Sequence, residues 1–175
     1  PFTVELLVSY DLDDSGLSCT FTATNRGSAT APIAYASHPY FGLDADSEIM
    51  VSATKAAINS ARALPVGECA SSELGFVPGE FVPVSTLSLD DCLMGFPDGK
   101  VSTVLTRPSI GRTVTVWQCD ELDYLMMFTR RPEGVPELLA IEPQSSPANA
   151  FRSGAGLVWL AEGESVTFDW GVSVS

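Results

Sequence analysis

The sequence is poor in histidine and in basic residues, and its cysteines are not clustered. It has one histidine, nine lysines and arginines, and a net charge of −13. Nucleic acids and anionic membrane surfaces attract basic proteins, so we expect neither as a partner. The cysteines form no CxxC pair, so we predict no metal and no cofactor, and we interpret them as buried, reduced thiols of a cytoplasmic protein. They are Cys19, Cys69, Cys92 and Cys119.

Several sequence signals of other protein classes are also missing. No apolar run reaches the length of about 18 residues that a membrane-spanning helix needs. Without a GxSxG, GxGxxG or GxxxxGK[ST] motif, the sequence lacks the usual marks of a serine hydrolase or a nucleotide-binding loop. The chain starts with Pro1, and "PFTVELLVSY" is typical of a strand from its second residue. We therefore expect that an N-terminal part of a longer domain is lacking.

Alternation of apolar and polar residues dominates the chain and predicts strands. The pattern is clear in 2–10, 17–24 and 165–174. The segment "DLDDSG" between the first two is typical of a hairpin turn, and the calcium loop that it partly resembles would need a glutamate at Thr22. Further strands are predicted at 30–38, 47–53, 101–107, 111–118, 123–130, 137–142 and 156–160. Regularly spaced strands indicate an all-β sandwich or barrel.

Two central stretches do not follow this pattern. Residues 53–64, "ATKAAINSARAL", have a composition that favours a helix, although their neighbours are strands, so their structure stays open. Residues 65–90 contain three prolines and are predicted to form a long irregular connection, which in a compact domain is usually functional or disordered.

Three side chains are candidates for chemistry. Glu142 follows an apolar run and precedes Pro143; on the apolar face of a strand its carboxylate would lose hydration and its pKa would rise, as suits a general base. His38 is expected at the end of a strand, and Asp90 is expected to be a buried acid. Structural alternatives remain, namely a salt-bridged or edge-exposed glutamate and a structural histidine.

Three segments together resemble the aldose 1-epimerase (galactose mutarotase) family. "SHPYFGL" is similar to its H-x-YF-x-L signature, "LDDCL" to its L-D-H-x-F segment, and "AIEPQSSPANAFRSGAGLVWLAEGESV" to its closing segment. Their order and spacing match over most of the chain. Asp91 stands where the family often has histidine, and Ala161 where proline is usual.

The resemblance implies a large antiparallel β-sandwich and the interconversion of α and β anomers of a free aldose. It implies that Glu142 removes the proton of the anomeric hydroxyl, that protonated His38 donates to the ring oxygen, and that Asp90 binds a sugar hydroxyl. Family members are roughly twice as long, and their first half supplies a second histidine and an arginine. Residues 1–175 are therefore expected to be one β-sandwich segment, the C-terminal half of an aldose epimerase-like domain.

Other functions remain possible at this point. The chain could be a non-catalytic carbohydrate-binding β-sandwich or an inactive truncated homologue that serves as a scaffold. A monosaccharide is the expected ligand. Because the strand at 2–10 would expose apolar side chains and unpaired backbone, we also expect the chain to associate with itself or with an N-terminal segment.

Overall fold

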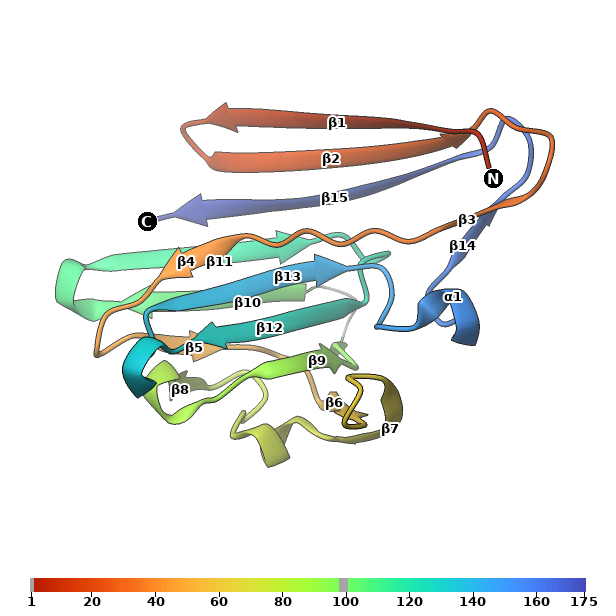
Figure 1. The fold of residues 1–175 in the computed structure, drawn as a ribbon. Helices are drawn as coiled ribbons and strands as arrows, with labels where there is room; N and C mark the ends of the chain where they lie inside the picture. Colours follow the sequence, from red (N-terminus) through yellow and green to blue (C-terminus); the bar gives the residue numbers. More distant parts are fainter. Residues whose placement is uncertain (1, 98–100) are drawn as a thin grey trace.

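A computed structural model describes residues 2–97 and 101–175, and in this part of the chain two sheets face each other (Figure 1). The first sheet has the order β1 (Val4–Asp13), β2 (Gly16–Asn25), β15 (Ser165–Val174), β11 (Arg112–Gln118), β10 (Val101–Arg107), β5 (Glu48–Met50) and β8 (Phe81–Pro83). The second sheet has the order β4 (Tyr40–Gly42), β13 (Leu138–Gln144), β12 (Tyr124–Arg130), β9 (Asp90–Met94), β6 (Lys55–Asn59) and β7 (Pro65–Ala70).

The remaining elements are short. Strands β14 (Val158–Leu160) and β3 (Ala31–Ile33) form a separate pair. The helical elements are α1 (Ala150–Ser153) and the 3-10 turns η1 (Ser71–Leu74), η2 (Val84–Thr86), η4 (Pro108–Ile110) and η5 (Pro132–Gly134). Among the described residues every strand pair is antiparallel, and no helix could span a membrane. The predicted antiparallel β-sandwich is confirmed.

The core between the two sheets follows from strand alternation. In β13, Leu139 and Ile141 point into the core, where they meet Leu105 and Val116 of the first sheet. Neighbouring residues of a strand face opposite sides, so Ala140 and Glu142 lie on the outer face of the second sheet. A second cluster joins β2 and β15 to the β3–β14 pair; it contains Cys19, Phe21, Ala23, Ile33, Leu122, Leu160, Phe168 and Trp170.

The structure decides the first central stretch, which the sequence had left open, and corrects the interpretation of the second. Residues 53–64, whose composition favours a helix, contain β6 and a turn, because β6 pairs with both β7 and β9 and buries Ala56 and Ala57. These tertiary contacts outweigh the helix propensity of alanine. Residues 65–90 are not irregular throughout: they include β7, β8, η1 and η2. Prolines and short strands hide the alternation there.

Two smaller predictions also need correction. The strand predicted at 30–38 is limited to β3, followed by an isolated bridge between Ala36 and Gln144. All four cysteines are free, as expected, but only Cys19 and Cys92 are buried, whereas Cys69 and Cys119 are half-buried. The hairpin turn is confirmed: Asp13 Oδ1 accepts hydrogen bonds from the backbone and hydroxyl of Ser15, at 2.7 and 2.6 Å.

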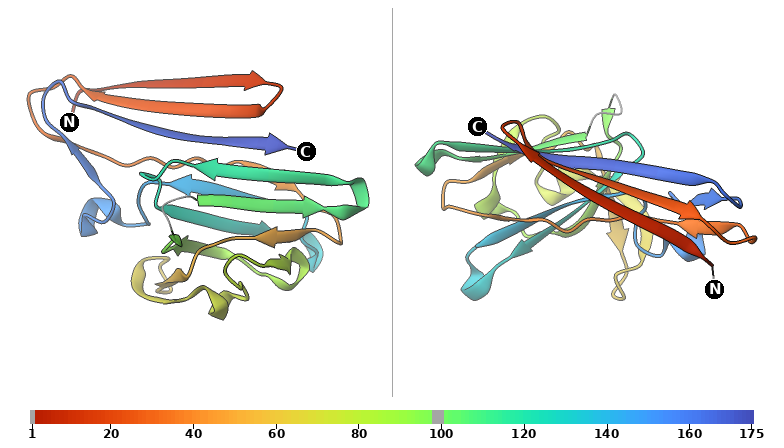
Figure 2. Two further views of the ribbon diagram at one scale, coloured as in Figure 1. Left: turned by 180° about the vertical axis from the view of Figure 1, so that it is seen from behind. Right: turned by 90° about the horizontal axis from the view of Figure 1, so that it is seen from above.

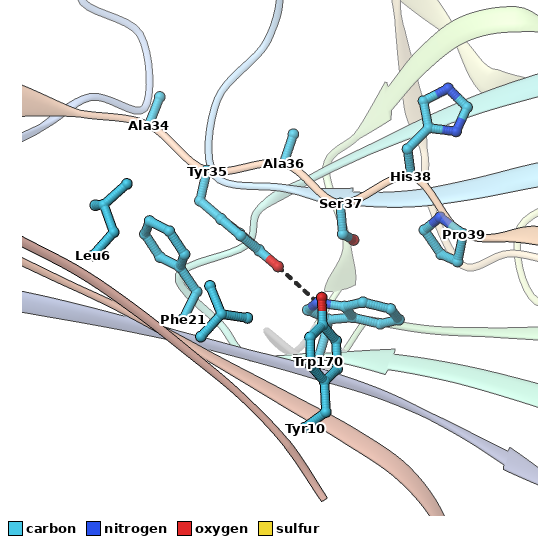
Figure 3. A pocket seen from close by; sticks show the side chains of 11 residues that line it. Leu6, Tyr10, Phe21, Ala34, Tyr35, Ala36, Ser37, His38, Pro39 and Trp170 are labelled. Carbon is cyan, nitrogen blue, oxygen red and sulfur yellow. Dashed lines mark hydrogen bonds between the residues drawn. The ribbon is translucent and has the colours of Figure 1, made fainter.

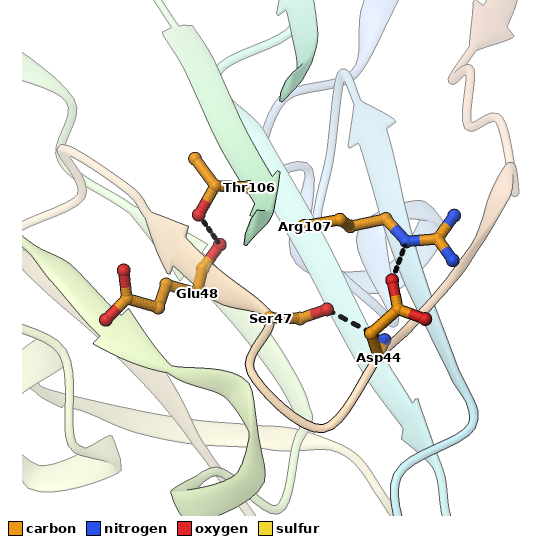
Figure 4. A network of polar contacts seen from close by, with 5 residues as sticks. All are labelled: Asp44, Ser47, Glu48, Thr106 and Arg107. Carbon is orange, nitrogen blue, oxygen red and sulfur yellow. Dashed lines mark hydrogen bonds and ion pairs between the residues drawn. The ribbon is translucent and has the colours of Figure 1, made fainter. Parts of the chain in front are cut away.

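A polar network holds the loop that passes from the second sheet to the first, between β4 and β5 (Figure 4). Arg107 Nε lies 2.7 Å from Asp44 Oδ2, and the Asp44 backbone N–H donates to the Ser47 hydroxyl at 2.9 Å. The Arg107 guanidinium lowers the pKa of the Asp44 carboxyl. Because β4 leads directly into this loop, the network fixes the strand that follows His38.

The β1–β2 hairpin projects from one end of the first sheet, away from the second sheet (Figures 1 and 2). The inner side of β1 carries Leu6, Val8, Tyr10 and Leu12, which are between 44% and 79% exposed. The β2 partners of Leu6, Val8 and Tyr10 are buried in the second cluster, so the apolar surface continues outward from the core onto an uncovered strand. Strand β1 is also an edge, with unpaired backbone groups along one side.

Close packing in the middle of the first sheet depends on Gly171. This residue of β15 pairs with Trp117 of β11, and a Cβ atom there would lie 2.5 Å from the Leu17 carbonyl oxygen and 2.5 Å from Trp117 Cζ2. We predict that Gly171→Ala lowers the free energy of unfolding by about 1–3 kcal/mol, because the backbone and the indole must move apart.

Chemical denaturation of both proteins would measure this change. The matched control is Gly67→Ala in β7, where the nearest atom to a new Cβ is Ile58 Cδ1 at 3.7 Å. The control should leave the stability nearly unchanged. Equal losses for the two variants would contradict the prediction.

Candidate active site

An extended segment in front of β4 carries His38. The Ser37 backbone N–H donates to the Pro143 carbonyl at 3.1 Å, and the Ile141 N–H donates to the Pro39 carbonyl at 3.2 Å. These bonds hold the segment along β13 although it is not a regular strand. His38 therefore does not end a strand, as we had expected, but precedes one. Pro39 has no N–H to offer and takes part through its carbonyl only.

The structure brings His38 and Glu142 together. His38 Nε2 lies 3.1 Å from Glu142 Oε1, and the side chains are 53% and 8% exposed. The carboxylate is therefore shielded while the imidazole remains open to solvent. A second neighbour, Gln144, lies on the same face of β13, with its Nε2 3.5 Å from Glu142 Oε2.

The pKa of Glu142 is raised above its ordinary value. Burial is the main cause, because the ionised form loses hydration, and the negative charge of Asp90 acts in the same direction. The positive charge of His38 and the hydrogen bond from Gln144 oppose this shift without cancelling it. The sequence had predicted this direction from the apolar surroundings of the strand.

Asp90 lies on the same outer face of the second sheet. Strand register pairs Glu142 with Met126 and Met126 with Cys92, while Asp90 pairs with Phe128 one step further along. Its side chain is exposed, so the expectation of a buried acid was wrong. The cause is the alternation of β9, which turns Leu93 into the core and Asp90 outward.

Two hollows meet near this constellation. A cavity of about 380 Å³ lies over β9 and β12 and is lined by Asp90, Cys92, Met126 and Gln144, among others. A wider groove of about 600 Å³ lies on the other side of the 34–39 segment and includes His38 (Figure 3). Ala36 lines both, whereas Glu142 is among the lining residues of neither. The segment therefore separates His38, which lines the groove, from Asp90, which lines the cavity.

The groove is largely aromatic. Trp170 Nε1 donates to the Tyr35 hydroxyl at 2.9 Å, and Phe21 stacks on Tyr35 with ring centroids 4.5 Å apart. Burial raises the pKa of Tyr35 to about 12, so this hydroxyl stays protonated. In Figure 3 the His38 ring and the Ser37 hydroxyl lie on opposite sides of the segment. His38 thus stands at the end of the groove, turned away from its aromatic floor.

Sequence reasoning missed several neighbours of His38 and Glu142. Tyr40 packs against His38 with ring centroids 4.8 Å apart, and Gln144 lies beside Glu142. Each follows its partner by two residues, so strand periodicity could have indicated both. Cys92 had been interpreted only as a buried, reduced thiol; burial raises its pKa to about 12, which keeps the thiol protonated in the cavity floor. Among the described residues, no group of three or more His, Cys, Asp or Glu could hold a metal ion.

Solved structures of similar fold place this geometry in context. A putative aldose 1-epimerase from Escherichia coli K12 superimposes with a TM-score of 0.82 at 20% identity, covering 100% of this chain and 61% of the other. Galactose mutarotase-like proteins from Clostridium acetobutylicum and Lactobacillus casei both give 0.81 at 21% identity. The match to the Clostridium protein covers 98% of this chain and 56% of that protein. The match to the Lactobacillus protein covers 100% of this chain and 64% of that protein.

The chain therefore spans about three-fifths of the length of these structures. No curated protein matches it significantly. The family model described as aldose 1-epimerase, however, matches residues 1–173, nearly the whole chain. The chain belongs to the aldose 1-epimerase family.

Proposed function

We propose that this chain is an aldose 1-epimerase, which interconverts the α and β anomers of a free aldohexose by opening and closing the sugar ring. The observation that carries the proposal is the 3.1 Å contact between the buried Glu142 carboxylate and the exposed His38 imidazole. Ring opening requires removal of a proton from O1 and donation of a proton to O5. Both oxygens are bonded to C1, so the base and the acid must lie side by side, as this pair does.

In the proposed reaction Glu142 accepts the O1 proton, and the electron pair of that bond forms the carbonyl at C1. The C1–O5 bond breaks at the same time, and its electron pair takes a proton from protonated His38. The open aldehyde then rotates about C1–C2. On closure O5 returns its proton to His38 and attacks C1, while protonated Glu142 gives its proton to O1. Atoms and electrons balance without a co-reactant.

The environment of Glu142 supports its role as the base. Burial raises its pKa, and a carboxylate with a raised pKa takes up a proton more readily near neutral pH. His38, which is half exposed, can reach a ligand on the outer face of the sheet. Asp90 lies on that face and is proposed to accept a hydrogen bond from a sugar hydroxyl.

A non-catalytic carbohydrate-binding domain is the alternative. The observation in its favour is that His38 does not line the cavity that contains Asp90. A sugar could bind in that cavity without contact to the acid. This non-catalytic alternative includes an inactive scaffold, in which His38 and Glu142 would form a structural ion pair.

We also propose a cytoplasmic location. All four cysteines are free, which suits a reducing compartment.

Replacing the base should abolish most of the catalysis. We expect Glu142→Gln to slow enzyme-catalysed mutarotation by about 10²–10⁴-fold, because a positioned base contributes this much and an amide cannot accept the proton. Sugar binding should persist, since the amide keeps the shape of the carboxylate. Polarimetry on fresh α-D-glucose and α-D-galactose measures the rate, and calorimetry measures the binding.

His38→Asn should act similarly, because the chain has no other histidine. The control is Glu68→Gln, which removes a carboxylate paired with Lys55 at an exposed position of β7. It should keep the wild-type rate. Full activity of Glu142→Gln would show that another group is the base, and a wild type that binds sugar without accelerating anomer exchange would favour the binding domain.

The raised pKa of Glu142 also predicts a pH-dependent stability difference. A carboxyl whose pKa is higher in the folded state stabilises the fold at low pH, and this contribution is lost as pH rises through the folded pKa. At neutral pH Glu142→Gln should therefore be at least as stable as the wild type. The advantage should vanish below the ordinary glutamate pKa of 4.5. Urea denaturation of the variant and the wild type from pH 4 to pH 8 tests this. The prediction is contradicted if the stability of the variant minus that of the wild type falls between pH 4 and pH 7.

The expected association of the chain, with itself or with a further polypeptide segment, stays a prediction, and the uncovered side of β1 supports it. If copies of the chain associate there, light scattering should give a mass above the monomer at high concentration. Leu6→Lys should lower this mass, because it places a charge on the inner face of β1. Leu7→Lys is the matched control, since the two leucines are 60% and 63% exposed but lie on opposite faces. A monomeric wild type would exclude self-association.

A further inference from the structure

The β6–β7 hairpin forms one wall of the cavity that contains Asp90. Asn59, Ala63 and Pro65 come from this hairpin, and Gln144 and Ser146 line the cavity from the end of β13 and the residues beyond it. The hairpin had been predicted as a possible helix followed by a loop. Its part in the cavity therefore follows only from the folded structure.

The lining of the cavity places Asn59 beside Asp90 of the proposed site. Ala56 of β6 pairs with Leu93 of β9, and both are in the core between the sheets. Asn59 lies beyond a shift in the register of β6, and it lines the cavity together with Cys92 and Asp90 of β9. The Asn59 and Asp90 side chains are both exposed, so their polar atoms are open to a ligand.

The backbone of the β6–β7 hairpin is irregular next to Asn59 and is held by a hydrogen bond across the turn. Its register shifts between Ile58 and Asn59, so that Ile58 pairs with Gly67 and Asn59 with Pro65. Such bulges re-aim side chains and are frequent beside active sites. The turn is closed by a hydrogen bond from the Ser60 N–H to the Leu64 carbonyl, at 2.9 Å. Ala63 has a φ of 54°, an uncommon conformation for a residue with a side chain, and strained residues of this kind gather at functional sites.

We propose that Asn59 is a substrate-binding residue that, together with Asp90, binds two neighbouring hydroxyl groups of the sugar and thereby selects among epimers. This inference rests on the proposed function, because it uses the same site. A carboxylate only accepts hydrogen bonds, whereas an amide both donates and accepts them. The two groups line one cavity and therefore suit a pair of adjacent hydroxyls, each of which can also donate and accept.

The distance from Glu142 indicates which part of the sugar they contact. Asp90 lies on β9, two strands away from Glu142 on β13. Neighbouring strands are about 4.8 Å apart, so the two backbones are separated by about 10 Å across the sheet. A pyranose ring with C1 at Glu142 would extend across Met126 and Cys92 toward Asp90 and Asn59. The recognised hydroxyls are then those remote from the anomeric carbon.

A set of deoxy sugars tests this recognition. Mutarotation and binding would be measured for D-glucose, D-galactose and their 3-, 4- and 6-deoxy forms, with the wild type and Asn59→Ala. In the wild type, loss of the recognised hydroxyl should raise KM by about five-fold, the value of one ordinary hydrogen bond. In Asn59→Ala the parent sugar should show the same rise, and the corresponding deoxy sugar should show no further change.

Ile58→Ala is the matched control, because this neighbouring side chain is also exposed but does not line the cavity. It should keep the wild-type KM and the wild-type dependence on each hydroxyl. If Asn59→Ala weakens all sugars equally, and the penalty for each missing hydroxyl persists, Asn59 has a structural role and the inference is wrong.

Binding measured by saturation-transfer NMR separates this inference from the proposed function. If the wild type does not accelerate anomer exchange but binds sugars with the same dependence on Asn59, the proposed function fails while the inference holds. If none of these sugars binds to the wild type, the inference is overturned as well.

Discussion

The two faces of β13 constrain the rest of the site. Leu139 and Ile141 are buried in the core between the sheets, and this packing sets the rotation of the strand. Glu142 must then point to the outer face, where residues 37–39 lie along the strand through backbone hydrogen bonds. A shift of one residue in the pairing would turn the carboxylate into the core and move it away from His38. The core therefore determines the position of the proposed base.

Burial of Glu142 costs stability and at the same time raises its pKa. A buried carboxylate loses hydration, and the folded state holds its proton more tightly than the unfolded chain does. His38 and Gln144 relieve part of this penalty without removing it. The same penalty makes Glu142 a better proton acceptor near neutral pH, as the proposed ring opening requires.

The proposed site combines elements from separate parts of the chain. The proposed acid His38 precedes β4, the proposed base Glu142 lies on β13, and Asp90 and Asn59 come from β9 and the end of β6. The sheet order β4–β13–β12–β9–β6 places them across one face in a row. Acid and base stand at one end, and polar groups suited to hydroxyls stand toward the other. The arrangement suits a small ring that must be both held and opened at C1.

Much of the fold could be predicted from the sequence where strands alternate cleanly. This holds for the terminal hairpin, for β15, and for the raised pKa of Glu142, because each depends on local pattern and on hydrophobicity. The central segment was different. Residues 53–64 have the composition of a helix, and only pairing with β7 and β9 makes β6 a strand.

The candidate site, like the fold, could be predicted from the sequence only in part. The sequence motifs that resemble the family predict His38, Glu142 and Asp90 as site residues, and this stays a prediction. Only the tertiary structure shows the 3.1 Å contact between His38 and Glu142 and the exposure of Asp90. The same holds for the place of Asn59 in the lining of the cavity that contains Asp90. The physical reason is that sheet order and register bring together residues far apart in sequence, and these depend on packing of the whole core rather than on any local pattern.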